Sequence, residues 1–277
     1  MSSFSGQLQL LRFWSELDAE EKLKLADQIL ELDLETLNKQ FKEAHLRKPV
    51  DGDTKPLDDD KIRSSVTSSE EERKTWRGRG LEAVGKNEVG VILLSGGQGT
   101  RLGSDEAKAL YDIGLPSKKS LLQIQAEKIQ RLESLSGGGT IAWYIMISES
   151  TEEDIRDALI ASKYFGLKEE QVKLFPQDTL PCLSDEGDIL LINQSTVARS
   201  PDGNGGLVKA LKEEGILADM KLRKLKHVFV CGVDNVLVKV ADPEFLGYCI
   251  DQEAECGNKV VRRVDGEHVG VTCLIGE

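Results

Sequence analysis

The sequence lacks the features that mark several common classes of protein. Among 277 residues only three are histidine and five are cysteine, and no two cysteines form a Cys-x-x-Cys pair, which argues against a zinc cluster. Scattered cysteines in odd number predict reduced thiols, as in the cytoplasm. No apolar run approaches the length that crosses a bilayer, and residues 1–7 show no signal-peptide pattern. We therefore expect a cytoplasmic protein with no membrane partner.

An excess of positive charge is also absent. The chain carries 36 Lys and Arg against 48 Asp and Glu, a formal net charge of −12. Because recognition of a nucleic-acid duplex depends on a basic face, the sequence predicts no nucleic-acid partner. A nucleotide ligand stays compatible with this charge, since it needs only a local cluster of cations. The length and a hydrophobic content of 39% allow a sizeable core.

Three regions of the chain differ in pattern. Residues 1–46 carry leucines at helical spacing and predict an N-terminal helical segment. Residues 47–87 are polar, lack a sustained period and predict a linker and lead-in. The acidic triplet at 58–60 fits a solvated linker better than a metal site. From 88 to 277, apolar runs alternate with amphipathic stretches, which indicates the main domain.

The main domain predicts an α/β fold with a mostly parallel sheet. The expected strands are short apolar runs at 89–94, 140–147, 171–175, 227–233, 258–263 and 267–273. Helices are expected between them, for example over 120–133 and after the Asp242-Pro243 start signal. Ligands of such folds bind beyond the carboxyl ends of the strands.

The strand at 89–94 ends in a glycine-rich loop, residues 95–99, which Arg101 and Lys108 follow. Glycine amides beside a guanidinium and an ammonium can cradle phosphate oxygens. Two common phosphate loops fail on spacing: a dinucleotide fingerprint would need glycine in place of Leu102, and a Walker A loop would need lysine in place of Ser104. Taken alone, the loop is equally compatible with a plain turn at a strand end.

Longer motifs in the rest of the chain turn the glycine-rich loop into a signal for one family. Together they closely resemble the eukaryotic UDP-N-acetylhexosamine pyrophosphorylases over essentially the whole chain. The matching segments are 10–14, 94–103, Lys108, 111–121, 123–127, 143–146, 164–167, 201–207, 233–235, 238–243 and 270–271. The resemblance implies the Rossmann-like sheet of the nucleotide-diphospho-sugar transferases, with residues 88–277 as the catalytic domain.

The resemblance also implies a reaction. Members of the family transfer a uridylyl group from UTP to an N-acetylhexosamine 1-phosphate, which forms UDP-N-acetylglucosamine or UDP-N-acetylgalactosamine and pyrophosphate. Arg101 would hold the departing pyrophosphate, and Lys108 would neutralise the charge that develops on the phosphate. Such a transfer depends on positioning and charge neutralisation more than on a protein nucleophile.

Further site residues follow from the same resemblance. Asn204 would contact the sugar, and Asp234 would hold Mg²⁺ or Mn²⁺. Gln177 would face the edge of the uracil. The residues expected to bind UTP are Leu94, Ser95, Gly96, Gly97, Lys108, Gln177 and Gly203.

The chain departs from the family pattern in two ways. Ala107 and Ala109 flank Lys108 where the family has proline and glycine, and Gly232 stands where the family commonly has cysteine. The sequence also stops about halfway through the pattern, so the C-terminal part of the family fold is missing. The alternative to an active enzyme is therefore a truncated, inactive relative that at most binds UTP or pairs with a full-length homologue. The preferred sugar and the oligomeric state, a homo-oligomer included, stay open.

Overall fold

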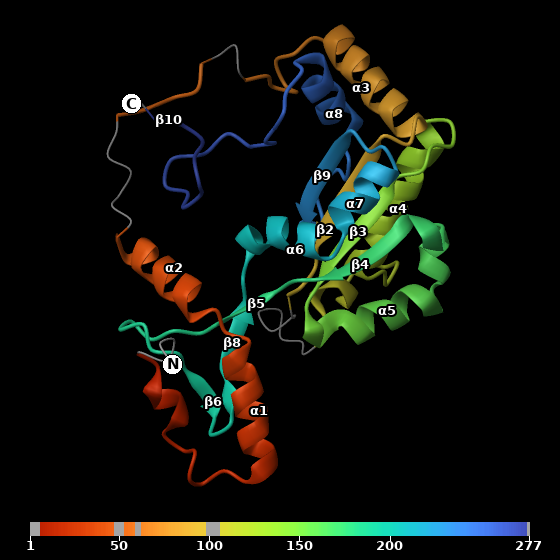
Figure 1. The fold of residues 1–277 in the computed structure, drawn as a ribbon. Helices are drawn as coiled ribbons and strands as arrows, with labels where there is room; N and C mark the ends of the chain where they lie inside the picture. The colour runs from red at the N-terminus through yellow and green to blue at the C-terminus, as the bar shows by residue number, and fades with distance from the viewer. Residues whose placement is uncertain (1–5, 47–52, 59–61, 98–105, 276–277) are drawn as a thin grey trace. The chain divides into compact units, whose positions relative to one another are not determined.

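The computed structural model describes residues 6–46, 53–58, 62–97 and 106–275 (Figure 1). These residues form two compact units, which are described separately. One unit comprises the described residues within 1–57, 179–202 and 272–277, and the other comprises the described residues within 58–178 and 203–271. No described helix has the length and apolar composition needed to span a bilayer.

The larger unit is built on a four-stranded parallel sheet, which confirms the predicted α/β fold. Its strands are β2 (Val89–Leu94), β3 (Ala142–Ile147), β4 (Val172–Pro176) and β9 (His227–Gly232). They lie in the order β4-β3-β2-β9. The chain thus moves outward from β2 through β3 to β4 and then returns to add β9 on the other side of β2. The carboxyl ends of β2 and β9 flank the point where the winding direction changes.

Four helices cover one face of this sheet: α3 (Glu70–Gly85), α4 (Leu121–Leu135), α5 (Glu152–Ala161) and α8 (Pro243–Asp251). Their apolar side chains form the main core with alternate residues of the strands, among them the fully buried Trp143. Because parallel strands are covered on both faces, they appear in the sequence as continuous apolar runs.

Helices α6 (Leu207–Glu213) and α7 (Ile216–Leu222) cover the opposite face. Strand residues that alternate with those of the main core, such as Ile92 and Tyr144, pack against them. The larger unit is completed by single-turn 3-10 helices: η4 (Lys108–Leu110), η5 (Glu149–Thr151), η6 (Lys163–Gly166), η7 (Glu169–Gln171) and η8 (Asn204–Gly206).

One carboxylate forms several hydrogen bonds on this second face of the sheet. The side chain of Asp219, which is 11% exposed, accepts hydrogen bonds from Tyr144 Oη at 2.8 Å, Lys173 Nζ at 2.6 Å and Arg223 Nε at 2.7 Å. Burial raises the pKa of Asp219, but the hydrogen bonds from these three donors outweigh it and leave the pKa below its ordinary value of 3.8. The carboxylate thus joins two strands to α7.

We expect Asp219→Asn to destabilise the larger unit by about 2 kcal/mol, because hydrogen bonds to a charged group are lost and two cations lose their partner. The stabilisation by Asp219 is complete above its unfolded-state pKa of 3.8 and is lost as the pH falls through the lower folded-state pKa. Urea unfolding should therefore show a weaker acid dependence in the variant below about pH 4. Asp157→Asn, at an exposed position of α5, is the control; an equal loss there would contradict the prediction.

The smaller unit combines N-terminal helices with two hairpins. Its helices are η1 (Leu8–Leu11), α1 (Ala19–Leu30) and α2 (Leu34–Leu46). Its strands pair antiparallel as β1 (Thr54–Lys55) with β10 (Leu274–Ile275), β5 (Thr179–Pro181) with β8 (Arg199–Pro201), and β6 (Leu191–Asn193) with β7 (Thr196–Val197). Leucines and an isoleucine of the helices share a core with Ile189 and Val197.

Two glutamine side chains fasten the helices to the hairpin. Gln7 donates through Nε2 to the carbonyl oxygen of Gly187 at 2.9 Å and accepts from the amide of Ile189 at 2.8 Å. Gln28 donates to the carbonyl oxygen of Ser195 at 3.1 Å and accepts from the amide of Val197 at 3.0 Å. Each amide group pairs with the backbone as a neighbouring strand would, which satisfies buried polar groups of the hairpin.

Two expected strands are absent from the structure. Residues 258–263 and 267–273 were predicted as strands, but the chain there forms neither strand nor helix. Their valines are exposed, with Val260 at 65% and Val269 at 52%. Valines favour an extended backbone, but a strand also needs a partner for its backbone groups, and these segments pair with no described strand.

Candidate functional site at the carboxyl edge of the sheet

The residues singled out in the sequence gather where the parallel strands end. The described part of the glycine loop, residues 95–97, follows β2, Gln177 follows β4, and Asp234 follows β9. In open α/β sheets this edge, at the point where the winding direction changes, is where ligands bind. The fold therefore places all three segments at the expected position.

The backbone of the glycine loop continues the sheet for one residue. The amide of Ser95 donates to the carbonyl oxygen of Met146 at 2.8 Å, and the carbonyl oxygen of Leu94 accepts from the amide of Val233 at 3.0 Å. Ser95 is 1% exposed, and its Oγ has no hydrogen-bond partner among the described residues. The loop is thus fixed between β3 and β9 before it turns at Gly96.

Lys108 and Asp234 come together across the site. The amide of Lys108 donates to the carbonyl oxygen of Gly97 at 3.1 Å, which fixes η4 against the glycine loop. Its Nζ lies 3.1 Å from Oδ2 of Asp234, and the two side chains are 22% and 61% exposed. One basic and one acidic group predicted to bind different parts of a ligand therefore pair with each other.

Gln177 lies between two glycines. Its Nε2 donates to the carbonyl oxygen of Gly203 at 3.3 Å, and its Oε1 would lie only 2.5 Å from a Cβ atom at Gly96. Gly203 has a φ of +71°, which glycine adopts without strain. A side chain at Gly96 would displace the end of Gln177, and a side chain at Gly203 would be strained by its backbone conformation.

Two predicted residues fall outside this description. Arg101 lies outside the described residues. Asn204 begins η8 directly after Gly203, so its backbone is placed at the site, whereas its side chain is not described. Sequence reasoning missed two residues of α4, Gln125 and Lys128, which bind the backbone just after Asp234. A glutamine and a lysine in an amphipathic helix give no signal that separates them from solvated positions.

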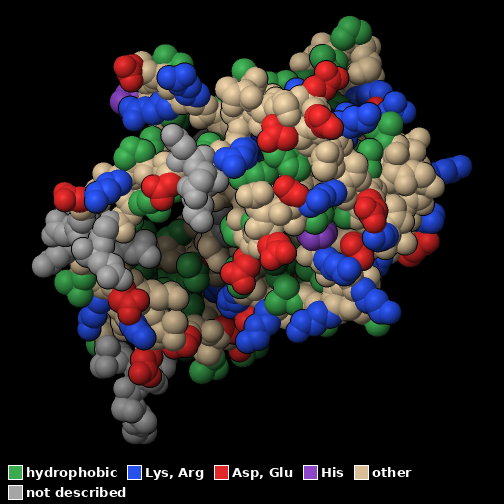
Figure 2. All heavy atoms as spheres, turned by 90° about the horizontal axis from the view of Figure 1, so that it is seen from above, with side chains coloured by type: hydrophobic (Ala, Val, Ile, Leu, Met, Phe, Trp, Pro, Cys, Tyr) green, Lys and Arg blue, Asp and Glu red, His purple; other side chains and the backbone are tan. Residues whose placement is uncertain are grey.

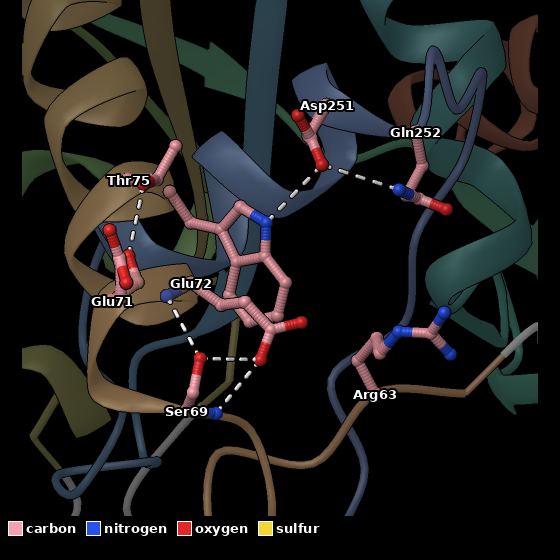
Figure 3. Close-up of a pocket in the computed structure, with 8 residues that line it drawn as sticks. Arg63, Ser69, Glu71, Glu72, Thr75, Asp251 and Gln252 are labelled. Carbon is pink, nitrogen blue, oxygen red and sulfur yellow. Dashed lines mark hydrogen bonds between the residues drawn. The ribbon is translucent and has the colours of Figure 1, made fainter.

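A pocket elsewhere in the larger unit has a different character (Figure 3). It lies between the start of α3 and the end of α8 and contains none of the predicted site residues. Ser69 and Glu72 in its wall cap α3 reciprocally, and the indole nitrogen of Trp76 donates to Asp251 at 3.4 Å. These polar groups therefore serve the helix ends and the contact between helices.

Comparison with known proteins decides the family. The family described as UTP–glucose-1-phosphate uridylyltransferase matches residues 34–275. The chain belongs to this family. The match covers the described site residues of this uridylyltransferase-family chain, from the glycine loop to Asp234.

Two relatives show the likeness in more detail. The chain is 43% identical to UDP-N-acetylglucosamine diphosphorylase 2 of Arabidopsis thaliana, an alignment that covers 96% of this chain and 55% of the relative. It is also 43% identical to the UDP-N-acetylglucosamine pyrophosphorylase of Saccharomyces cerevisiae, over 99% of this chain and 60% of the relative. The resemblance expected from the motifs is confirmed.

Solved structures agree with the fold. The uridine diphosphate N-acetylglucosamine pyrophosphorylase from Trypanosoma brucei, solved with an inhibitor, superposes with a TM-score of 0.78 at 29% identity, over 90% of this chain and 53% of that chain. This uridylyltransferase-family chain spans about half the length of the relatives that it matches.

Proposed function

We propose that the chain acts as a uridylyltransferase on UTP and an N-acetylhexosamine 1-phosphate. The observation that carries the proposal is the meeting of Lys108 and Asp234 at the switch point of the sheet, beside the glycine loop. The ammonium and the carboxylate, 3.1 Å apart, would act as a phosphate-binding cation and a metal-binding anion side by side. The relatives named as UDP-N-acetylglucosamine pyrophosphorylases support the choice of substrates.

In the proposed reaction a phosphate oxygen of the sugar phosphate attacks the α-phosphorus of UTP. The new P–O bond forms as the bond between the α-phosphorus and its bridging oxygen breaks, and pyrophosphate leaves with the electron pair. Lys108 offsets the negative charge that develops on the phosphoryl oxygens, which is the main task of a protein in such transfers. The Lys108 ammonium would then lie between the triphosphate and Asp234.

The uridine would lie against Gln177. A primary amide offers both a donor and an acceptor, which complement the carbonyl and N–H groups on the edge of uracil. The absence of a side chain at Gly96 lets the amide lie close to the loop. The base and the phosphates would thus be bound by segments that follow different strands.

The donor set of the site fits Mg²⁺ or Mn²⁺. Asp234 offers oxygen ligands on a side chain that is 61% exposed, and the described residues contain no group of three or more metal-ligating side chains. Mg²⁺ with nucleotides is commonly held by one or two carboxylates together with phosphates and water. When bound, the ion neutralises phosphate charge. Asp234 would be the residue of this chain that holds it.

A direct assay tests the proposal. The purified chain is incubated with UTP, Mg²⁺ and N-acetylglucosamine 1-phosphate, and released pyrophosphate is measured. Binding is followed separately by unfolding: UTP at a hundred times its dissociation constant should stabilise the protein by about 2.7 kcal/mol. Release of pyrophosphate supports the proposal, whereas absence of both release and stabilisation refutes it.

One outcome of this assay would favour a different function. UTP-induced stabilisation without pyrophosphate release would indicate a relative that binds UTP without turnover. The coverage of only 55% of the Arabidopsis thaliana relative is the observation on which this alternative depends. Adding N-acetylgalactosamine 1-phosphate as a second acceptor separates absence of turnover from a preference for the other sugar.

Replacing Gly96 with alanine should weaken UTP binding by about tenfold, equivalent to about 1.4 kcal/mol. The new Cβ would lie 2.5 Å from Oε1 of Gln177 and 3.5 Å from the backbone of Ile147, so Gln177 must leave its position. Isothermal titration with UTP measures the loss. Gly270→Ala, where no atom lies within 4 Å of the new Cβ, is the control, and unchanged affinity in Gly96→Ala would show that the Gln177 position is not used.

The charge distribution and the cysteines fit this function. On the face that Figure 2 shows, acidic and basic side chains are interspersed, as expected for a protein whose ligand is bound at a local site. All five cysteines are free, and burial raises the pKa of the Cys231 thiol to about 11. We place the chain in the cytoplasm, where thiols stay reduced.

A further inference from the structure

Helix α4 reaches under the loop that carries Asp234. Gln125, which is completely buried, donates through Nε2 to the carbonyl oxygen of Asn235 at 3.4 Å. One turn later, Lys128 donates through Nζ to the carbonyl oxygens of Val236 at 2.6 Å and Val238 at 2.9 Å. Three of the four backbone carbonyl groups in residues 235–238 are therefore bound by side chains of one helix.

The Lys128 ammonium has an unusual set of partners. Its third hydrogen bond goes to Oε1 of Gln125 at 3.2 Å, so the acceptors of these three hydrogen bonds are all uncharged oxygens. No ion pair among the described residues includes Lys128, although Lys119 near the start of the same helix pairs with Glu127. Burial lowers the pKa of the Lys128 ammonium. A half-buried cation without a counter-ion is costly, and fixing the loop backbone is what its contacts achieve.

The loop that α4 binds, residues 235–238, directly follows Asp234 of the candidate site. The amide of Val236 donates to the carbonyl oxygen of Asp234 at 3.0 Å, and the amide of Val238 donates to that of Asn235 at 3.1 Å. A shift of residues 236–238 would therefore move Asp234. At its other end, α4 is tied to the segment after Lys108, because the amide of Leu121 donates to the carbonyl oxygen of Tyr111 at 3.2 Å. One helix thus fixes the backbone beside both members of the Lys108–Asp234 pair.

We propose that Lys128, together with Gln125, is a positioning residue that holds the 235–238 loop so that the Asp234 carboxylate faces Lys108 and the metal-bound triphosphate. The proposal rests on the proposed function, since it concerns the same site. Lys128 itself makes no contact with the reacting groups in this assignment. It acts through the backbone of Val236 and Val238.

The first test needs no ligand. Lys128→Met keeps the length and apolar stem of the side chain but removes all three donors. Hydrogen exchange at the amides of Val236 and Val238 should then accelerate by about tenfold or more, because the loop opens locally. Arg131→Met, which removes a cation from an exposed position of α4, is the matched control. Unchanged exchange in Lys128→Met would overturn the proposal, whether or not the chain binds UTP.

The second test measures the role of the loop at the site. The Mg²⁺ concentration that gives half-maximal UTP binding, measured by titration calorimetry, should rise by about 10- to 100-fold in Lys128→Met, as for other groups that orient metal ligands. UTP affinity without Mg²⁺ should stay close to that of the wild type. A purely structural role would lower the unfolding temperature and leave the Mg²⁺ midpoint unchanged, which would overturn the proposal.

A milder variant protects the test against misfolding. Lys128→Gln retains one donor group and should give exchange rates and a Mg²⁺ midpoint between those of the wild type and Lys128→Met. If only this variant folds, its midpoint decides: a raised value supports the positioning role, and the wild-type value overturns it. If the wild-type chain binds no UTP, the proposed function fails, while hydrogen exchange still decides whether α4 holds the loop.

Discussion

Gly80→Ala should destabilise the larger unit by about 2 kcal/mol or more, although alanine is the better helix former. Gly80 lies where α3 crosses α8, and a Cβ atom there would overlap the carbonyl oxygen of Pro243. Gly247 occupies the same crossing from the side of α8, where a Cβ would overlap the carbonyl oxygen of Trp76. Because both obstacles are backbone atoms, no rotation of a side chain can relieve them, and the helices must separate.

The same helix supplies a control with the opposite sign. Gly78 is exposed on α3, and no atom lies within 4 Å of a Cβ added there, so Gly78→Ala should stabilise the protein by about 1 kcal/mol through helix propensity. Urea unfolding of both variants measures the two effects. Stabilisation by Gly80→Ala as well would show that α3 and α8 do not pack as closely as the structure has them.

This helix also shows what sequence patterns miss. The whole of α3 lies in residues 47–87, which were predicted as a polar linker and lead-in because the apolar side chains of this helix do not recur at helical spacing. A local signal was present nonetheless: Ser69 and Glu72 stand in the spacing of a capping box. In the structure the amide of Glu72 donates to Ser69 Oγ at 3.2 Å, and the amide of Ser69 donates to Glu72 Oε2 at 2.8 Å. The contact between α3 and α8 depends on closely packed glycines, and these leave no periodic apolar pattern in the sequence.

The strands of the sheet were predictable because their apolar residues, unlike those of α3, form a clear pattern in the sequence. Strands β2 and β3 are buried along almost their whole length, so they appear in the sequence as apolar runs. Strand β9 gives a shorter apolar run between His227 and Gly232, and it exposes Val228 and Val230. The order of the strands was not predictable, since pairing of β2 with β9 joins segments far apart in the chain. Valines at 258–264 gave a similar pattern but remain exposed, because pattern alone does not supply a neighbouring strand.

The candidate site also has a part that the sequence predicts and a part that it does not. Residue types and motifs identified Lys108 and Asp234 separately, but their contact joins positions 126 residues apart and depends on β9 lying beside β2. Contacts between side chains and the backbone of a loop are still harder to foresee. Lys128 was missed because its function depends on which carbonyl groups a distant loop presents to α4.

Lys108→Ala should reduce pyrophosphate release by about 10²- to 10³-fold, the loss typical of removing one group that stabilises transition-state charge. The effect has two physical sources. The phosphoryl oxygens lose the cation that offsets their developing charge, and Asp234 loses its partner at 3.1 Å, which leaves an uncompensated carboxylate beside the triphosphate. Because the second source also acts on bound UTP, nucleotide affinity should fall together with turnover.

The two sources can be separated by a second variant. In Lys108→Ala combined with Asp234→Asn, the uncompensated carboxylate is gone, so UTP affinity without Mg²⁺ should recover while pyrophosphate release stays low. Lys74→Ala, at an exposed position of α3, controls for the loss of one positive charge from an acidic protein. Turnover in Lys108→Ala equal to that of Lys74→Ala would remove Lys108 from the mechanism. Recovery of turnover in the double variant would instead show that Lys108 acts only by neutralising the Asp234 carboxylate.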